Sequence, residues 1–362
     1  MPDVSMQALL AEVVKRNSSD LHLSVGMPPS MRIDGDLYSV GNIPPLNSDN
    51  MKNLISSVLS KKQIEEFFES KELDFSFTFN SAEGESARFR GNCFFQVGTM
   101  GAALRMIPNR VRSTRQLLLP TYLDEIAAKR RGLFLVTGPT GHGKSTTLAA
   151  IIQQINLSRR CHIVTIEDPI EYMFTSERAI IHQREVGHDT ASFKEALKRV
   201  LRQDPDVIMI GEMRDLETIG AAITAAETGH LVLATLHTQD AAQTIDRIID
   251  VFPPYQQAQI RQQLSNILIA ICSQQLLPLP GGGRVVGTEL LVATPAARNC
   301  IREGKTGQLK SILQTGSELS MHSMDQDLAR MVKENKIPYD LANEFSYDPK
   351  DLQRLVFETN IA

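Results

Sequence analysis

The sequence lacks tryptophan and holds few aromatic residues, which make up 6% of its 362 residues. With so few aromatic side chains, no platform for stacking nucleic-acid bases is evident. Cysteine is also scarce, and no Cys-x-x-Cys pair is present, which argues against a zinc module or a redox motif. We expect reduced, buried thiols at the four scattered positions, Cys93, Cys161, Cys272 and Cys300.

The sequence also lacks a strong charge of one sign and a long apolar run. Its formal net charge is −4 at pH 7, so no global basic field favours nucleic acid or an anionic membrane. No window approaches the ~20 apolar residues of a membrane-spanning helix, and the amino terminus has no secretory signal pattern. We therefore expect a cytoplasmic protein whose association with a membrane depends on a partner.

The remaining composition is that of a globular protein with a sizeable core, and its length favours about two domains. Strand-like runs interleaved with a few helical stretches predict a small α+β domain over residues 1–107. The polar, basic segment 108–115 has no periodicity and is the expected linker. From 116 to 362 strands and helices alternate, which is typical of a parallel α/β sheet covered on both faces.

Individual elements of the larger domain follow from short apolar runs and from amphipathic spacing. Strands are expected at 132–137, 161–167, 206–211, 231–236 and 285–292, and helices at 145–157, 190–203, 215–228, 240–250 and 256–275.

The most informative motif is a full match to the phosphate-binding pattern G-x-x-x-x-G-K-[ST], between an expected strand and an expected helix. In this context backbone N–H groups can cradle phosphates at the helix N-terminus. Lys144 would reach the β- and γ-phosphates, and the Ser145 hydroxyl would bind Mg²⁺. The sequence therefore predicts a nucleoside triphosphate site at Gly138, Pro139, Thr140, Gly141, His142, Gly143, Lys144, Ser145 and Thr146.

Two carboxylates follow neighbouring strands at the edge where open α/β sheets bind ligands. Glu167 ends one apolar run, and Glu212 ends another that has the form of a Walker B strand. Gly211 stands where such a strand usually has its Mg²⁺-binding aspartate, so the metal must rely more on Ser145, phosphate and water. We expect Glu212 to orient or deprotonate the attacking water.

Two histidines stand at opposite ends of the strand expected at 231–236. His237 leaves this strand on the nucleotide side and is the better candidate for sensing the γ-phosphate. For His230 a structural or interface role fits the pattern as well as a direct catalytic one. The strand between them is about 20 Å long, so the two histidines cannot share a metal ion.

Phosphoryl transfer usually needs a further cation, and the strand ends of the larger domain offer only Lys144. The smaller domain carries Arg88, Arg90 and Arg105 on its last strands. Two roles are open for these arginines: closure over the nucleotide as arginine fingers, or simple solvation on an exposed sheet face.

Together these runs resemble the bacterial secretion and type IV pilus motor ATPases, most closely the PilT-type retraction ATPases of twitching motility. The resemblance covers nearly the whole chain. Near the C-terminus Ala297–Glu303 is similar to the family's retraction motif A-I-R-N-L-I-R-E, although Ala297 and Cys300 replace the usual Ile and Leu. The other matching runs are Ser19–Leu23, Gly26–Pro29, Arg88–Arg90, Ile166–Glu171, Gln183–Val186, Asp204–Asp206, Gly211–Thr218, Ala226–His230, Thr235–Thr238 and Asp246–Arg247.

The resemblance implies a PAS-like amino-terminal α+β domain joined to a RecA-like P-loop ATPase domain, assembled as a homohexamer. It implies that hydrolysis of ATP with Mg²⁺ drives pilus retraction, with an inner-membrane platform protein as partner and pilin as an indirect one. It implies a cytoplasmic protein that associates with the inner membrane through the pilus machinery. No nucleic-acid partner is expected. The resemblance implies functional roles for Lys144, Ser145, Glu167, Glu212, His230 and His237. It also implies that Arg90 and Arg105 are the arginine fingers.

Three alternatives stay open. The altered retraction motif leaves room for a PilU-like accessory ATPase. A second alternative is a RecA-like motor on nucleic acid, which would need a basic pore. A third is a nucleotide-dependent scaffold without hydrolysis, which would not need the intact Lys144, Glu167 and Glu212. Helical spacing places Arg298 and Arg302 of the retraction motif on one charged face, which the resemblance implies couples ATP turnover to retraction.

Overall fold

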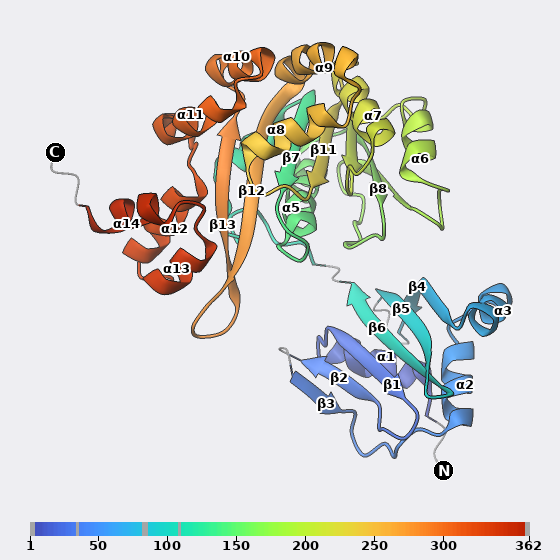
Figure 1. The fold of residues 1–362 in the computed structure, drawn as a ribbon. Helices are drawn as coiled ribbons and strands as arrows, with labels where there is room; N and C mark the ends of the chain where they lie inside the picture. Colours follow the sequence, from blue (N-terminus) through green and yellow to red (C-terminus); the bar gives the residue numbers. More distant parts are fainter. Residues whose placement is uncertain (1–3, 34–35, 82–85, 108–109, 359–362) are drawn as a thin grey trace. The chain divides into compact units, whose positions relative to one another are not determined.

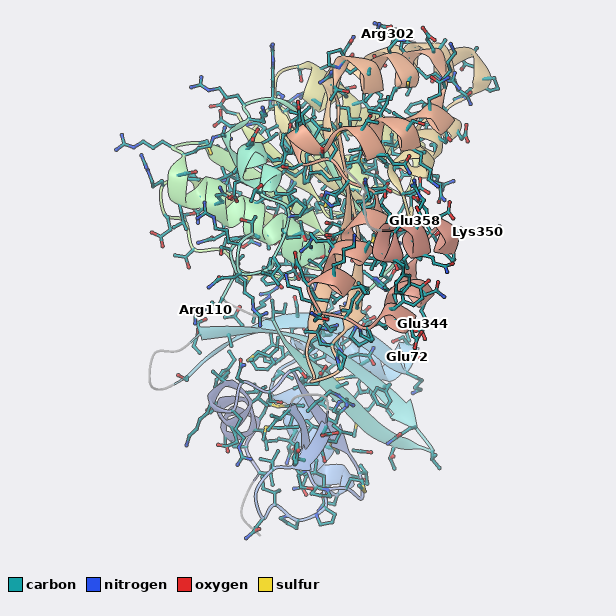
Figure 2. The ribbon with its side chains drawn as sticks, turned by 90° about the vertical axis from the view of Figure 1, so that its left-hand side faces the viewer. Glu72, Arg110, Arg302, Glu344, Lys350 and Glu358 are labelled. Atoms are coloured by element: carbon teal, nitrogen blue, oxygen red, sulfur yellow. The ribbon has the colours of Figure 1, made fainter. Side chains whose placement is uncertain are left out.

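The computed structural model divides into two compact units, Met1–Arg110 with Glu171–Met173 and Val111–Ile170 with Phe174–Ala362 (Figure 1). Charged side chains such as Arg302 and Lys350 lie on the surface of the second unit (Figure 2). The predicted domain boundaries stay a prediction, and linker residues 108 and 109 lie outside the described residues. The structure describes residues 4–33, 36–81, 86–107 and 110–358.

The first unit contains an antiparallel sheet in the order β3-β2-β1-β6-β5-β4. Buried and more exposed residues alternate along much of β5, so one face of the sheet covers the core. The elements agree with the small α+β domain expected from the sequence. They are α1 (Met6–Lys15), β1 (Asp20–Ser24), β2 (Ser30–Ile33), β3 (Asp36–Ser39), α2 (Ser48–Ser56), α3 (Lys61–Ser70), β4 (Glu72–Asn80), β5 (Ser86–Gln96) and β6 (Thr99–Ile107).

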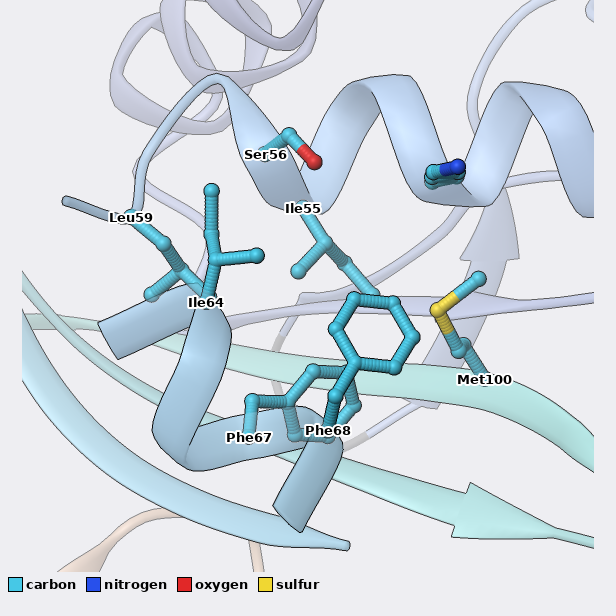
Figure 3. Close-up of a pocket in the computed structure, with 8 residues that line it drawn as sticks. Ile55, Ser56, Leu59, Ile64, Phe67, Phe68 and Met100 are labelled. Carbon is cyan, nitrogen blue, oxygen red and sulfur yellow. The ribbon is translucent and has the colours of Figure 1, made fainter. Parts of the chain in front are cut away.

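A small hollow lies in the first unit, where α2 and α3 meet the beginning of β6 (Figure 3). Its lining is mainly apolar, and Phe67, which is almost fully buried, belongs to the core of this unit. The hollow therefore lacks the convergent polar groups of a catalytic site. Its lining residues are Lys52, Ile55, Ser56, Leu59, Ile64, Phe67, Phe68 and Met100.

The second unit is built on a mixed sheet in the order β13-β12-β7-β11-β10-β8-β9. Neighbours from β12 to β9 pair in parallel, whereas β13 pairs antiparallel with β12. Every residue of β7 and β11 is buried, so both faces of the sheet are covered there. The strands are β7 (Gly132–Thr137), β8 (His162–Glu167), β9 (Ile180–Glu185), β10 (Val207–Ile210), β11 (Leu231–Leu236), β12 (Leu268–Pro278) and β13 (Arg284–Val292).

The helices of the second unit follow the strands and continue to the C-terminal end of the described chain. The helices α4 to α9 lie between or beside the strands, α10 lies beside α9, and α11 to α14 lie on the β13 side of the sheet (Figure 1). They are α4 (Tyr122–Ala128), α5 (Lys144–Ser158), α6 (Phe193–Val200), α7 (Leu216–Glu227), α8 (Ala241–Asp250), α9 (Pro254–Ile267), α10 (Pro295–Glu303), α11 (Leu309–Thr315), α12 (Met324–Lys333), α13 (Tyr339–Phe345) and α14 (Pro349–Phe357).

The structure corrects the sequence prediction at two places in this sheet. The helix expected at 256–275 ends at Ile267, and strand β12, the second strand from one edge of the sheet, follows at once. A short apolar run alone fits a buried strand and a buried helix equally well. Pairing with β7 makes residues 268–278 a strand. Strand β9 was not predicted, since its exposed and half-buried residues at the sheet edge leave no apolar run.

Candidate nucleotide site

The phosphate-binding loop joins β7 to α5, as the motif predicts. Gly138, Gly141 and Gly143 have φ angles of 140°, 81° and 81°, which side chains rarely allow. A Cβ atom at Gly138 would lie 2.3 Å from the carbonyl oxygen of Gln274, so the close approach to β12 requires glycine there. The loop leads directly into the N-terminus of α5, where N–H groups and the helix dipole favour an anion.

Lys144 starts α5 and is only 7% exposed. Its Nζ atom donates to the carbonyl oxygens of Gly138 at 2.8 Å and Pro139 at 2.9 Å. The same Nζ atom lies 3.5 Å from Nδ1 of His237, and that Nδ1 lies 3.4 Å from the Thr140 hydroxyl. The structure thus brings the predicted lysine, the loop and the predicted sensor histidine together.

The two predicted carboxylates lie at the ends of the neighbouring strands β8 and β10. Glu212 places Oε2 3.2 Å from Nε2 of His237, and its other oxygen pairs with Arg214. Glu167 is 5% exposed, and its Oε1 accepts a 2.7 Å hydrogen bond from the Thr165 hydroxyl. His237 therefore stands between Lys144 on one ring nitrogen and Glu212 on the other.

Gly211 occupies the place of the usual Walker B aspartate, and the structure shows a steric reason for a small residue. A Cβ atom at Gly211 would lie 3.3 Å from both Glu167 Cα and the Ile166 carbonyl oxygen. The amide N–H of Gly211 already donates to that carbonyl oxygen at 2.8 Å. Any side chain at 211 would therefore press on the end of β8 that carries Glu167.

His230 lies at the other end of β11, away from the residues gathered around Lys144. Its Nδ1 atom lies 2.9 Å from the Ala225 carbonyl oxygen and 3.2 Å from the Thr228 hydroxyl. These contacts tie the ring to the C-terminal end of α7. Within the described chain His230 thus has a structural environment, and a catalytic role for it stays a prediction.

Both predicted arginine fingers belong to the first unit. Arg90 on β5 and Arg105 on β6 face each other directly in the sheet register. The Arg105 side chain is 70% exposed, while its Nε atom donates to Oδ1 of the buried Asp20 at 2.8 Å. Two like charges therefore stand opposite each other on adjacent strands, and the Asp20 carboxylate on the third strand compensates one of them.

Sequence reasoning missed Gln274, which lies on β12 beside the loop. Its Nε2 atom donates to the His142 carbonyl oxygen, and its Oε1 atom accepts from the Thr147 hydroxyl at 2.8 Å. The available signal is a glutamine at the end of an apolar run, which the sequence prediction places in a helix rather than in β12. Gln274 thereby ties the loop to the strand beside it.

His142 of the loop also reaches β12. Its Nδ1 atom accepts a 3.0 Å hydrogen bond from the backbone N–H of Leu276. Burial lowers the pKa of His142, and the positive charge of Lys144 lowers it further. The neutral ring is therefore the form that fits the folded loop.

The comparisons with known proteins identify the family of this chain. The family model described as "Type II/IV secretion system protein" matches residues 3–336. The chain belongs to this secretion ATPase family. The predicted fold class, an α/β ATPase with a smaller amino-terminal domain, and the prediction of an ATP-hydrolysing enzyme are both confirmed.

Two similar pilus ATPases match almost the whole length of this chain. The chain is 47% identical over 343 residues to the type IV pilus retraction ATPase PilT of Pseudomonas aeruginosa, covering 95% of this chain and 98% of that protein. It is 40% identical over 354 residues to the type IV pilus ATPase PilU of the same organism, covering 98% and 91%. A crystal structure of the pilus retraction motor PilT with bound ADP superposes with a TM-score of 0.89 at 46% identity, covering 97% and 99%.

None of the helices in the described ranges is both long and apolar enough to cross a membrane. The same residues contain no group of three or more His, Cys, Asp or Glu side chains that could hold a metal ion.

The environment of His142 predicts a pH-dependent stability. Because its folded pKa lies below the unfolded value of about 6.5, the unfolded chain takes up this proton first as the pH falls. The contribution of His142 to stability is therefore complete above about pH 6.5 and is lost as the pH falls below it. We expect His142→Ser to show a smaller drop in Tm between about pH 7.5 and pH 5.5 than the parent chain. Thermal unfolding across a pH series measures this, and equal drops in both proteins would contradict it.

Proposed function

We propose that this chain is a motor ATPase that couples ATP hydrolysis to retraction of the type IV pilus. The convergence of Lys144, His237 and Glu212 at the phosphate-binding loop carries the proposal. The 47% identity with a retraction ATPase over 95% of the chain supports the pilus as the object of the motor.

The residues present fit ATP with Mg²⁺. The loop offers backbone N–H groups at the start of α5 and the cation of Lys144, and Ser145 offers a hydroxyl to the metal. Bound ATP supplies the phosphoanhydride bond that is hydrolysed. Glu212 would take the proton of the attacking water, and His237, hydrogen-bonded to it, would report the γ-phosphate to that carboxylate.

The proposed roles of Lys144 and Glu212 separate binding from turnover. Lys144→Ala should weaken ATP binding because it removes the cation at the β- and γ-phosphates. Glu212→Gln keeps the shape of the side chain and should retain binding, but we expect kcat to fall by about 10²-fold or more. Titration with a fluorescent ATP analogue and a phosphate-release assay distinguish the two. Hydrolysis by Glu212→Gln at the parental rate would show that Glu212 is not the base.

The nucleotide site of one chain needs a further cation, and we propose that Arg90 and Arg105 supply it within a homohexamer. Their opposed positions on β5 and β6 and the exposure of Arg105 support this role. Asp20 holds Nε of Arg105, which leaves the terminal nitrogens of its guanidinium for an anion.

This assembly predicts that the purified protein sediments as a hexamer and that Arg105→Ala lowers ATPase activity while the chain stays folded. Arg16→Ala is the matched control, because Arg16 is an exposed arginine of the same unit that pairs with Glu12 on α1. Analytical ultracentrifugation, Tm and phosphate release are measured for all three proteins. A monomer with full activity at every concentration would remove the ring from the mechanism.

The altered retraction motif forms α10, and the structure separates the roles of its two arginines. Arg298 donates to the carbonyl oxygens of Ser265, Asn266 and Leu268 and so caps the C-terminus of α9. Burial lowers the pKa of Arg298, although an arginine stays charged in this environment. Arg302, in contrast, is exposed on the surface of α10 (Figure 2). Arg302 is therefore the better test of coupling, because its removal leaves this cap intact.

In cells, deletion of the gene should give hyperpiliated bacteria that do not twitch, because pili would still extend but not retract. A copy with Arg302→Ala should leave ATPase activity within about twofold and reduce twitching, whereas Lys305→Ala on the same surface is the control. Pilus counts by electron microscopy and twitching zones measure both. Normal twitching in the deletion strain would contradict the retraction function.

The same strain tests the PilU-like accessory role, to which Ala297 and Cys300 and the 40% identity with PilU point. An accessory ATPase would leave retraction partly active after deletion. We propose an inner-membrane platform protein as direct partner and pilin as an indirect one, with the ATPase on the cytoplasmic side of the inner membrane.

A further inference from the structure

The segment between His237 and α8 is held at three points by residues from different elements. The hydroxyl of Thr238 lies 2.7 Å from that of Thr244 on α8 itself. The carbonyl oxygen of Gln239 accepts a 2.7 Å hydrogen bond from the Tyr347 hydroxyl. The backbone N–H of Ala241 donates to Oε1 of Glu289 at 2.9 Å. Two of these three contacts come from residues that are distant in the sequence. Tyr347, between α13 and α14, lies more than a hundred positions from Gln239, and Glu289 on β13 lies about fifty positions from Ala241.

Glu289 on β13 joins the N-termini of two helices. Besides accepting from Ala241, the first residue of α8, its carboxylate lies near the backbone N–H of Met324, the first residue of α12, and both N–H groups favour its charged form. The side chain is 5% exposed, and burial raises its pKa to about 7, against the effect of the two N–H groups. One buried carboxyl group thus links the helix that follows His237 to the helix that begins the C-terminal group.

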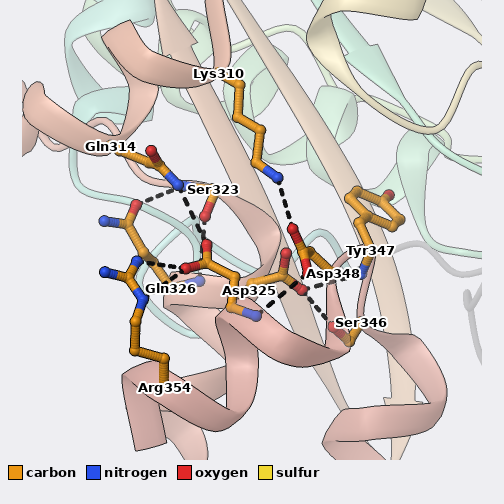
Figure 4. Close-up of polar contacts among 10 residues, drawn as sticks. Lys310, Gln314, Ser323, Asp325, Gln326, Ser346, Tyr347, Asp348 and Arg354 are labelled. Carbon is orange, nitrogen blue, oxygen red and sulfur yellow. Dashed lines mark hydrogen bonds and ion pairs between the residues drawn. The ribbon is translucent and has the colours of Figure 1, made fainter. Parts of the chain in front are cut away.

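Tyr347 lies between α13 and α14, and α12 fixes its backbone (Figure 4). Oδ1 of Asp325, a residue only 2% exposed, accepts from the Tyr347 N–H at 3.0 Å and from the Ser346 hydroxyl at 2.7 Å. Next to it, Asp348 pairs with Lys310 of α11 and caps α14 (Figure 4). The base of the tyrosine is therefore anchored by side chains from several helices, while its hydroxyl reaches the segment after His237.

We propose that Tyr347 is a positioning residue for His237, through which the C-terminal helices α12–α14 set the place of the imidazole between Lys144 and Glu212. This inference rests on the proposed role of His237 at the γ-phosphate. The His237 ring must keep both of its contacts at once, Nδ1 at 3.5 Å from Nζ of Lys144 and Nε2 at 3.2 Å from Oε2 of Glu212. A small displacement of the segment that follows it disturbs both contacts, and catalysis is steeply sensitive to such shifts.

The position of Tyr347 also gives the C-terminal helices a defined effect on the site. Asp325 and Glu289 tie the start of α12 to Tyr347 and to α8, so a displacement of α12 is passed to both ends of the segment 239–241. A ligand or partner that moves these helices would thereby change turnover without touching the nucleotide.

Tyr347→Phe tests this proposal because it removes one hydroxyl and keeps the ring. Tyr339→Phe is the matched control, since the Tyr339 ring packs on Phe357 of the same helical group with centroids 5.0 Å apart. Hydrogen–deuterium exchange of the nucleotide-free full-length protein is the first measurement. We expect Tyr347→Phe to speed exchange in peptides that cover 238–242 by about threefold or more, and Tyr339→Phe to leave it unchanged.

Steady-state ATPase kinetics are the second measurement. We expect Tyr347→Phe to lower kcat by about three- to tenfold with KM for ATP within twofold, because binding through Lys144 is retained. Parental kcat and parental exchange at 238–242 in Tyr347→Phe would overturn the proposal, as would an equal fall of kcat and Tm in both variants. Absence of ATPase activity in the parent protein would instead overturn the proposed function, and the exchange measurement would still decide whether Tyr347 holds the segment.

Discussion

The larger unit depends on the parallel register of β7, β11, β10 and β8. Each strand is buried, and each ends at the same edge of the sheet, so the residue that follows it is delivered to one place. The loop with Lys144 follows β7, His237 follows β11, Glu212 follows β10, and Glu167 ends β8. A slip of one residue in any pairing would turn the side chains of that strand to the other face. Burial of apolar strands therefore places the polar groups.

Lys144 and Glu167 at this edge have little access to water and are stabilised by specific partners. Lys144 is compensated by two loop carbonyl oxygens, and Glu167 by the hydroxyl of Thr165. Removing such partners leaves a buried charge or polar group unsatisfied, which costs about 1–3 kcal/mol or more. Gln274 and His142 perform a related task for the loop backbone by fastening it to β12. The loop is thus preorganised by contacts to a strand that the phosphate-binding motif does not include.

Much of this arrangement was predictable, because local patterns determine it. The phosphate-binding motif, the apolar runs and the polar residues after them predict, without any knowledge of tertiary contacts, that Lys144, Glu212 and His237 lie at one edge of the sheet, where the structure has them. What the sequence did not reveal depends on partners far away in the chain. Strand β12 needs β7 beside it to be distinguished from a continuation of α9, and Gln274 becomes recognisable only once that strand is in place. Arg298 looks like a surface arginine by helical spacing, yet it caps a helix more than thirty residues earlier in the chain.

The crowding around Gly211 has a consequence for how metal and nucleotide are handled. The protein offers no carboxylate at this position, and the backbone of β8 lies too close for one to be introduced without displacement. With the Ser145 hydroxyl as its proposed protein ligand, a magnesium ion would take most of its coordination from phosphate oxygens and water. Such an ion would be bound mainly by the nucleotide rather than by the enzyme. It would arrive with ATP and depart with the product, so its occupancy would follow each turnover instead of the concentration of free magnesium.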